Sequence, residues 1–342
     1  MSNSSSDLRK RVLSGMRPTG KPHLGNYMGA LYNWVRLQHE YECYFFVADL
    51  HALTTDYADP SQFRQNTREV ALDFLAAGID PELCTIFVQS EVKQHMELHL
   101  YLSMITPLGW LERVPTYKEQ QENLTTKDLS TYGFLGYPLL QSADILIYQA
   151  ELVPVGQDQV AHVEITREIA RRFNQFYPGV ARPGQHILPE PQVLLTPSPK
   201  LPGTDGRKMS KSYGNTILLT DPEPVIRQKL KPMVTDPARV RRTDPGNPEV
   251  CPVFDLHKVF SSVETQQKAR EGCTTAGIGC IECKSWVADA IIAELSPIQE
   301  RRRRFENDPA LVTDILKAGE QRATARAEQT MVQVRAAMGL GG

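Results

Sequence analysis

The segment RVLSGMRPTGKPHLGNYMGALYNWVRLQHEYECYFFVAD, residues 11–49, decides the fold class. Its first six residues have the pattern of a buried strand, and a loop containing proline and glycine follows. Tyr27, Leu31 and Trp34 then recur at spacings of four and three, the period of one helical face. The aromatic and β-branched run CYFFVAD, residues 43–49, suits a strand covered on both faces. The segment therefore predicts a strand, a helix and a second strand.

Downstream segments repeat this alternation. Phe63, Val70 and Phe74 mark one face of a helix that Gly78 closes, and the run TIFVQS at residues 85–90 is a third buried strand. Because parallel strands are joined by connections that cross the sheet, usually through a helix, this order of elements indicates a parallel sheet. The predicted fold class is α/β, with a Rossmann-like parallel sheet.

The later segments are less regular. Residues 95–150 are mostly helical by pattern, and the short strand LVPVG at 152–156 leads into a helix from about 158 to 173. The proline-rich stretch 178–206 is typical of a loop. Beyond residue 221 the pattern changes to helices interrupted by proline and glycine, without further buried-strand runs.

This change of pattern predicts two domains. We expect a catalytic α/β domain at residues 1–217 and a smaller, all-helical C-terminal domain at residues 218–342.

The overall composition narrows the class of protein. The chain has 342 residues, 41% of them hydrophobic, and a formal net charge of −2. A near-neutral protein that binds nucleic acid must concentrate its positive charge locally. The polar N-terminus and the lack of a long apolar run predict a cytoplasmic protein without a secretory signal or membrane span. In that compartment clustered cysteines are expected to be metal ligands or catalysts.

The loop PHLGN, residues 22–26, lies between the first strand and the first helix, where α/β sheets bind nucleotides. Helix N-terminal amides attract phosphate oxygens, and His23 adds an imidazole donor. Gly25 would let an adenine ring lie against the backbone. A helix cap with a solvated histidine is the alternative. The sequence contains neither GxxxxGK[ST] nor GxGxxG, so a nucleotide would be bound by another device.

A second loop, KMSKS at residues 208–212, supplies such a device. Glycines on both sides leave it free to move, and the ammonium groups of Lys208 and Lys211 can stabilise charge on a departing pyrophosphate. Ser210 and Ser212 can donate to phosphate oxygens. Alone, the loop could be a solvated turn. In combination with the upstream histidine loop, it predicts an ATP site.

The two loops resemble the HIGH and KMSKS signatures of class I aminoacyl-tRNA synthetases, with Asn26 as the last residue of the first signature. This form is common in tryptophanyl enzymes. Four further segments are similar to tryptophanyl-tRNA synthetases, and the similarity covers essentially the whole chain: GMRPTG at 15–20, YPLLQSADI at 137–145, VPVGQDQ at 153–159 and KLPGTDG at 200–206. The resemblance implies ATP-dependent activation of L-tryptophan, with Mg²⁺ accompanying ATP, and transfer to tRNA(Trp).

The resemblance also implies roles for individual residues. Asp144 would accept the indole N–H from within an apolar pocket, with Tyr137, Gln141 and His51 beside it. The catalytic residues would be His23, Asn26, Lys208 and Lys211. The residues that contact ATP would be Arg17, Pro18, Thr19, Gly25, Asn26, Lys118, Gly156, Gln157, Asp158, Leu201, Lys208, Met209, Ser210, Lys211 and Ser212.

Several of these roles have structural alternatives. Arg17 stands where the family often has glutamine. Asp158 could be a helix N-cap, and Lys118 could be a solvated surface lysine. His51 could be a buried histidine whose hydrogen bonds are satisfied by the backbone, and Asp144 a surface acid of a helix.

Cysteines at positions 251, 273, 280 and 283 form the series C-x21-C-x6-C-x2-C. Four thiolates suit zinc or an iron–sulfur cluster, and the spacing does not choose between them. A subset of tryptophanyl enzymes has a very similar series, thought to hold a four-iron four-sulfur cluster. The resemblance therefore implies a 4Fe-4S cluster at Cys251, Cys273, Cys280 and Cys283, with zinc as the alternative. Cys43 and Cys84 are interpreted as small core residues.

Two basic groups in the C-terminal part could contact tRNA phosphates. One is Arg227, Lys229, Lys231, Arg239, Arg241 and Arg242, and the other is the run 301–304. Solvated helix faces with internal ion pairs are the alternative. The resemblance implies an anticodon-binding role for the helical domain and a homodimer through residues 95–150.

Three other functions remain open from the residues. The nearest is a tyrosyl-tRNA synthetase, which shares the fold and an equivalent helix acid. The second is a small-molecule adenylyltransferase. The third is a metal-cluster RNA-binding regulator without turnover, which an assay of ATP turnover would identify.

Overall fold

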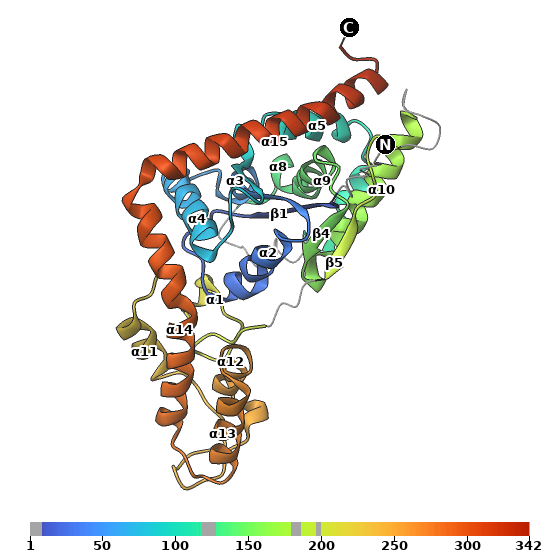
Figure 1. Ribbon diagram of the computed structural model, residues 1–342. Coiled ribbons are helices and arrows are strands. Elements are labelled where there is room, and N and C mark those ends of the chain that lie inside the picture. Colours follow the sequence, from blue (N-terminus) through green and yellow to red (C-terminus); the bar gives the residue numbers. More distant parts are fainter. Residues whose placement is uncertain (1–8, 116, 118–127, 179–185, 196–199, 342) are drawn as a thin grey trace, which may run out of the picture.

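The computed structural model describes residues 9–115, 117, 128–178, 186–195 and 200–341. Within these residues five strands form one sheet in the order β3-β2-β1-β4-β5, and each neighbouring pair is parallel. The strands are β1 (Arg11–Met16), β2 (Glu42–Val47), β3 (Thr85–Val88), β4 (Leu152–Val155) and β5 (Gln192–Leu195). The predicted parallel α/β sheet is confirmed (Figure 1).

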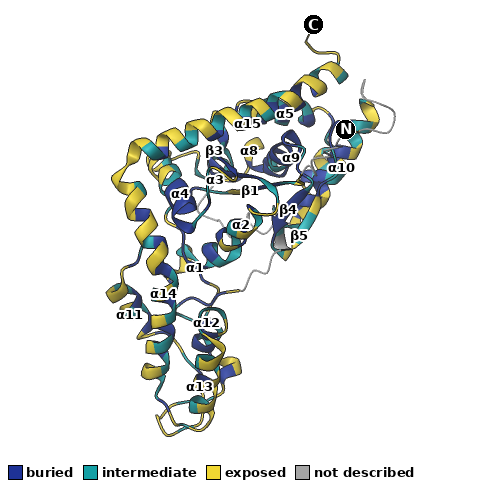
Figure 2. Cartoon of the chain, viewed as in Figure 1, coloured by how far each residue is buried: buried dark blue, intermediate teal, exposed yellow. Residues whose placement is uncertain are grey.

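Both faces of the sheet are buried, and strands β1 to β4 lie inside the molecule (Figure 2). Along β2, Cys43 and Phe45 belong to the hydrophobic cluster on one face, whereas Tyr44 and Phe46 belong to the cluster on the other. This alternation follows from the two-residue period of a strand. A strand with apolar residues at every position needs cover on both faces, as the sequence predicted for residues 43–49.

Helices cover the two faces. The first cluster is covered by the π-helix η1 (Tyr27–Leu31) and by α2 (Tyr32–Leu37), α4 (Phe63–Ala77) and α14 (Cys280–Asn307). The second cluster is covered by α5 (Gln94–Ser103), α9 (Tyr137–Ile147), α10 (Val160–Phe176) and α15 (Pro309–Ala337). Short elements complete this part: α1 (Leu24–Asn26), α3 (Asp49–Asp56), η2 (Gln89–Glu91), α6 (Leu108–Leu111), α8 (Tyr132–Leu135), η3 (Gln157–Gln159) and η4 (Lys211–Tyr213).

The C-terminal part is helical. It begins with α11 (Glu223–Leu230), η5 (Pro248–Val250), α12 (Pro252–Phe260) and α13 (Val263–Thr274), which extend away from the sheet with the first half of α14 (Figure 1). The second half of α14 then packs on α4, and α15 packs on β3 and α5. The expected domain at 218–342 therefore consists of a projecting section and a long final helix that lies against the sheet.

The contact between α15 and β3 is close. A Cβ added at Gly319 would lie 1.7 Å from the carbonyl oxygen of Ile86, so only glycine permits this approach. Because β3 is the first strand in the sheet order, α15 covers an edge of the sheet.

Three elements differ from the sequence prediction. The strand predicted at 43–49 stops at Val47, and Asp49 already begins α3. The strand predicted at 85–90 stops at Val88, and η2 begins at Gln89. Strand β5 lies inside the stretch 178–206, which was predicted to be a loop. The prediction failed because β5 is a four-residue edge strand with intermediate or exposed side chains, so it lacks a buried-strand pattern.

The order of the strands positions a crevice. From β1 the chain proceeds to β2 and β3 on one side, and it later returns to β4 and β5 on the other. In sheets of this kind ligands bind where the direction reverses, at the carboxyl ends of the two central strands. The carboxyl ends of β1 and β4 are therefore the expected location of a site.

Candidate active site

A cavity of about 370 Å³ opens at the carboxyl ends of β1 and β4. Its walls include Gly15 on β1, Gly156 after β4 and Trp34 on α2. This volume is within the usual range for small-molecule sites. Four residues of the predicted tryptophan pocket line it together: His51, Tyr137, Gln141 and Asp144.

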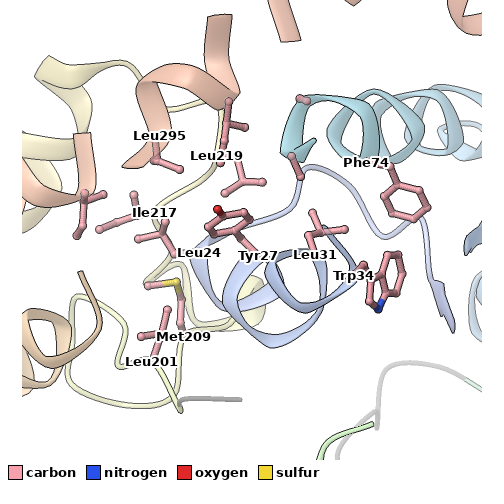
Figure 3. Close-up of a cluster of buried hydrophobic side chains, with 14 of the residues drawn as sticks. Leu24, Tyr27, Leu31, Trp34, Phe74, Leu201, Met209, Ile217, Leu219 and Leu295 are labelled. Carbon is pink, nitrogen blue, oxygen red and sulfur yellow. The ribbon is translucent and has the colours of Figure 1, made fainter. Parts of the chain in front are cut away.

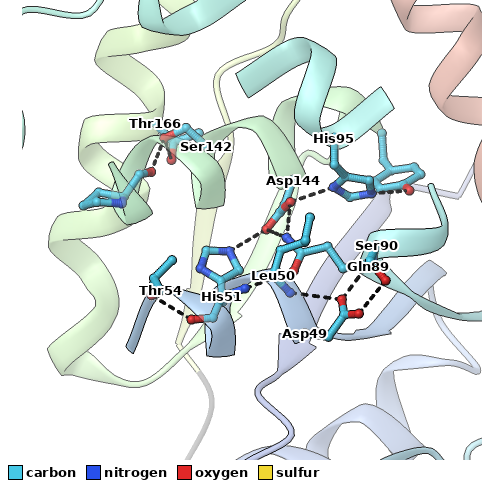
Figure 4. A network of polar contacts seen from close by, with 12 residues as sticks. Asp49, Leu50, His51, Thr54, Gln89, Ser90, His95, Ser142, Asp144 and Thr166 are labelled. Carbon is cyan, nitrogen blue, oxygen red and sulfur yellow. Dashed lines mark hydrogen bonds and ion pairs between the residues drawn. The ribbon is translucent and has the colours of Figure 1, made fainter. Parts of the chain in front are cut away.

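Asp144, on α9, lines this cavity, and Figure 4 shows its carboxylate within a network of polar contacts. Its carboxylate is 1% exposed and accepts hydrogen bonds from His51 Nε2 at 2.7 Å and His95 Nδ1 at 2.6 Å. Gln89 Nε2 lies 2.8 and 2.9 Å from its two oxygens. Burial by itself would raise the pKa of Asp144, but the hydrogen bonds from the two histidines outweigh it and lower the pKa to about 2. The cavity therefore presents an ionised acceptor in apolar surroundings.

A second cavity, of about 600 Å³, lies between the two signature loops. Of the residues predicted to bind ATP or to act in catalysis, it is lined by Arg17, Pro18, Thr19, His23, Asn26, Ser210, Lys211 and Ser212. Arg17 also lines the first cavity, so the two cavities adjoin at its side chain. An elongated ligand with one end at Asp144 and the other between the loops would pass this guanidinium.

The first signature folds as a small cap. His23 Nδ1 accepts from the Gly25 N–H at 3.0 Å, and Asn26 Oδ1 accepts from the His23 N–H at 3.1 Å. A Cβ at Gly25 would lie 2.8 Å from the His23 ring, which explains the glycine. Burial, and then the ammonium groups of Lys211 and Lys208, lower the pKa of His23 to about 4. The imidazole is thus neutral at pH 7 with its proton on Nε2, as a donor to an anion requires.

The segment that follows the second signature is hydrogen-bonded to the first. Leu24 N donates to Ile217 O at 3.0 Å, and Leu219 N donates to Pro22 O at 3.1 Å. Lys211 Nζ donates to Thr19 O at 3.0 Å, and burial lowers its pKa. The lysine therefore reaches the loop that follows β1, across the second cavity.

Leu201 and Met209 are placed differently. Their side chains are 3% and 4% exposed and belong to a hydrophobic cluster with Leu24 and Leu295 (Figure 3). A nucleotide could contact these two residues only through their backbone groups.

The remaining predicted ATP residues are placed as follows. Gly156 lines the first cavity, whereas the side chain of Gln157 is exposed. Lys208 is also exposed and lines neither cavity. Lys118 lies outside the described residues, and the side chain of Asp158 is not among those described.

Sequence reasoning missed several residues of the site. Gln89 and His95 hold Asp144, and the second cavity is also lined by Thr55, Asp56, Asp59, Gln62, Phe63 and Asn66. Gln89 could have been identified from the sequence, because it directly follows β3 and the residues at the carboxyl ends of parallel strands often bind ligands. His95 lies on α5, and nothing in the sequence around it indicates a role in the site.

The four predicted metal ligands lie near one another. Burial, and then the thiols of Cys251, Cys273 and Cys280, raise the pKa of Cys283 to about 12. His257 Nε2 is 3.3 Å from Cys283 Sγ. Within the described residues, however, no group of three or more His, Cys, Asp or Glu side chains is arranged to hold a metal ion.

Many of the basic side chains are already engaged. Arg227 pairs with Glu223 and Asp289, and Lys229 pairs with Asp221 at 2.6 Å. Arg239 donates to the carbonyls of Arg242 and Ile278. In the run 301–304, Arg301 donates to the Ala76 carbonyl, and Arg302 is buried against Asp73 and Glu69. The exposed basic residues of the first group are Lys231, Arg241 and Arg242.

None of the helices in the described part of the chain has the length and apolar character needed to cross a membrane.

Comparisons with known proteins agree with this geometry. The chain matches the family described as tRNA synthetases class I (W and Y) over residues 6–296. It is 56% identical to a tryptophan–tRNA ligase of Thermotoga maritima, with 96% of this chain and 99% of the relative covered. It is 49% identical to a tryptophan–tRNA ligase of Ralstonia nicotianae, with 97% and 98% covered.

Among solved structures, tryptophanyl-tRNA synthetase from Campylobacter jejuni in complex with ADP and tryptophan superposes with a TM-score of 0.86. The identity is 33%, and 96% of this chain and 100% of that chain are covered. Tyrosyl-tRNA synthetase from Archaeoglobus fulgidus, at 22% identity and a TM-score of 0.65 over 87% and 91% of the chains, shares the fold. The chain therefore belongs to the class I tRNA synthetases of the tryptophan and tyrosine group, and within that group to the tryptophanyl-tRNA synthetases.

Proposed function

We propose that this chain activates L-tryptophan with ATP in the two adjoining cavities and then transfers the tryptophanyl group to tRNA(Trp). The observation that carries the proposal is that both cavities meet at Arg17, one ending at the ionised Asp144 and the other lying between the signature loops. Tryptophan would occupy the first cavity, ATP with its Mg²⁺ the second, and the two would react where the cavities meet.

Asp144 selects the indole ring. Its carboxylate accepts the indole N–H, which is the sole hydrogen-bond donor on that side chain. His51, Tyr137 and Gln141 complete the polar lining. Phenylalanine would leave the buried carboxylate without this donor, which is why such sites discriminate strongly. Tyrosine also has a donor, so the depth of the cavity must exclude it.

The chemical step needs no side-chain nucleophile. The tryptophan carboxylate attacks the α-phosphate in line, and pyrophosphate leaves with the negative charge. Catalysis is therefore positioning and charge stabilisation. His23 Nε2–H and Asn26 act on one side of the triphosphate, Lys208 and Lys211 on the other, and Arg17 acts at the α-phosphate. Pro18, Thr19, Ser210 and Ser212 line the second cavity and complete the triphosphate site. Gly25 and the backbones of Leu201 and Met209 are also proposed to contact ATP.

We further propose that Gly156, Gln157 and Asp158 hold the ribose of ATP and that Lys118 reaches its triphosphate. The position of Gly156 in the wall of the first cavity supports the ribose site.

Exchange of pyrophosphate into ATP without tRNA tests the activity directly. With tryptophan and tyrosine assayed in parallel, we expect exchange with tryptophan alone. Exchange with tyrosine alone would refute the assignment of the first cavity. No exchange with either, from folded protein, would favour an adenylyltransferase or a regulator without turnover.

The projecting helical section is proposed to bind tRNA. Positive charge that is already paired contributes little to polyanion binding, so the exposed Lys231, Arg241 and Arg242 are the proposed phosphate contacts. We place the boundary between the catalytic part and the tRNA-binding part near residue 217. Helix α15 is assigned to the catalytic part because it packs on β3 and α5.

The four cysteines are proposed to hold a 4Fe-4S cluster. Four thiols from the loop before α12, from α13 and from the start of α14 converge, and their mutual proximity supports a shared ligand. The series C-x21-C-x6-C-x2-C is very similar to that of the tryptophanyl enzymes thought to hold such a cluster, and this resemblance supports iron over zinc.

Metal analysis tests this assignment. Protein purified without oxygen is expected to contain about four iron atoms and four acid-labile sulfides per chain, and Cys280→Ser combined with Cys283→Ser to lose both. One zinc per chain would establish the alternative ion. Absence of both metals from freshly purified protein would exclude a metal site.

A homodimer is proposed through α5 and α6. Four apolar residues at intervals of four are exposed there: Met96 at 43%, Leu100 at 53%, Met104 at 68% and Leu108 at 60%. An exposed apolar stripe of this kind is typical of a protein–protein interface. A second copy of the chain is the simplest partner, because an isologous pairing would cover both stripes at once.

Light scattering tests the dimer. Leu100→Glu with Met104→Glu is expected to give a monomer, because the interface would bury unpaired carboxylates. Val263→Glu, at a site 72% exposed on α13, is the matched control and should leave the mass unchanged. A wild-type protein that is monomeric at micromolar concentration would contradict the proposal.

A further inference from the structure

A chain of buried polar groups lies behind Asp144, outside the cavity. His95 Nδ1 is 2.6 Å from Asp144 Oδ1, and His95 Nε2 is 2.7 Å from the Tyr148 hydroxyl (Figure 4). Both His95 and Tyr148 are 0% exposed, and neither lines the cavity. Among the described residues, the hydrogen bonds that connect His95 and Tyr148 with the cavity pass through the Asp144 carboxylate.

The direction of each hydrogen bond follows from the chemistry of the partners. An ionised carboxylate only accepts, so His95 Nδ1 must carry a proton. A relay through His95 requires a neutral imidazole, in which Nε2 is an acceptor and the Tyr148 O–H donates to it. Burial raises the pKa of Tyr148 well above its usual value, so the hydroxyl keeps its proton. Tyr148 thus fixes the tautomer in which His95 faces Asp144 with an N–H.

The surroundings strengthen this arrangement. The rings of Phe46, Phe87 and Tyr148 lie 6.1, 6.0 and 5.4 Å from the His95 ring, measured between centroids. In such apolar surroundings an unpaired nitrogen is costly, and a carboxylate oxygen without a donor would turn toward another one. The orientation of Asp144 therefore depends on His95 together with Gln89 and His51, which also donate to the carboxylate.

We propose that His95, held in its Nδ1–H tautomer by Tyr148, is a positioning residue for tryptophan selection that aims the Asp144 carboxylate at the indole N–H. The inference rests on the proposed role of Asp144. His95 does not touch the substrate. His95 acts by keeping the Asp144 carboxylate in place, so that the negative charge of this carboxylate stays on the side of the cavity.

Two variants of the same histidine separate positioning from packing. In His95→Asn the amide nitrogen lies near the place of Nδ1 and can still donate to Asp144, whereas in His95→Gln it lies near the place of Nε2. We expect His95→Asn to keep the KM for tryptophan within about threefold of wild type. We expect His95→Gln to raise this KM about 10- to 100-fold, because it loses one hydrogen bond to a charged group. The KM for ATP should not change in either variant.

Tyr148→Phe provides a second, gentler test, because it removes one oxygen atom. It is expected to raise the KM for tryptophan about three- to tenfold in the wild-type background. In the His95→Asn background it should have no further effect, since asparagine has no tautomer to fix. This non-additivity distinguishes a relay from two independent packing effects.

The outcomes are distinct. Equal losses in His95→Asn and His95→Gln, or a KM for ATP that rises together with that for tryptophan, would overturn the inference, as would full tryptophan affinity in His95→Gln. The Asp144→Asn variant, measured in the same experiment, tests the proposed function itself. If Asp144→Asn leaves tryptophan binding unchanged, the pocket assignment fails, whatever the His95 variants do. Thermal melting of each variant verifies that it is folded.

Discussion

Lys211→Ala is expected to lower the rate of tryptophanyl-adenylate formation about 100- to 1,000-fold, with the dissociation constant for tryptophan unchanged within about twofold. Lys211 lines the second cavity and reaches Thr19, but it does not line the cavity assigned to tryptophan. Its ammonium group would meet the negative charge that builds on pyrophosphate during the reaction. An interaction made only in the transition state affects the rate and leaves ground-state binding intact.

The measurement pairs single-turnover adenylate formation with tryptophan binding at equilibrium. Lys317→Ala, at an exposed position on α15, removes the same charge elsewhere and should leave both quantities unchanged. Equal losses of rate and tryptophan affinity in Lys211→Ala would show that the lysine has no role in the transition state.

Asp144→Asn is expected to reduce kcat/KM for tryptophan by at least about 100-fold and to weaken the discrimination against phenylalanine. The substitution removes the negative charge and places an amide N–H₂ among donors from His95 and Gln89. The acceptor for the indole N–H is therefore lost or turned away.

Asp49→Asn is the matched control. Asp49 is also a buried carboxylate, at the start of α3, where it accepts a hydrogen bond from Ser90, but it does not line the cavity. Its variant should lose stability without losing selection for tryptophan. Pyrophosphate exchange with tryptophan, tyrosine and phenylalanine gives the comparison, and unchanged tryptophan kinetics in Asp144→Asn would remove that residue from the pocket.

The fold was predictable where a strand is buried on both faces, because an uninterrupted apolar run then appears in the sequence. Strands β1, β2, β3 and β4 were identified for this reason. Strand β5 was missed because an edge strand with partly exposed side chains has no such pattern. Helix α3 was missed because its first residues directly follow β2, without a turn to separate them.

The candidate site was predictable in part. The signature loops gave His23, Asn26 and Lys211, which the structure brings together around one cavity. The partners of Asp144 were not predictable, because His95 comes from α5, and only the folded chain places that helix beside α9. The ion pairs of Arg227 and Lys229 were likewise hidden in the sequence, where both residues simply count as positive charge.

The close contact of α15 with β3 has a consequence for synthesis on the ribosome. The strands of the sheet emerge first, and residues 309–337, which cover the β3 edge, are made after all five of them. Until Gly319 has left the exit tunnel, the β3 edge of a growing chain stays open to pairing with a neighbouring chain. Nascent chains that stall before this helix should therefore depend on chaperones and be prone to aggregation, although every residue assigned here to catalysis has already been made.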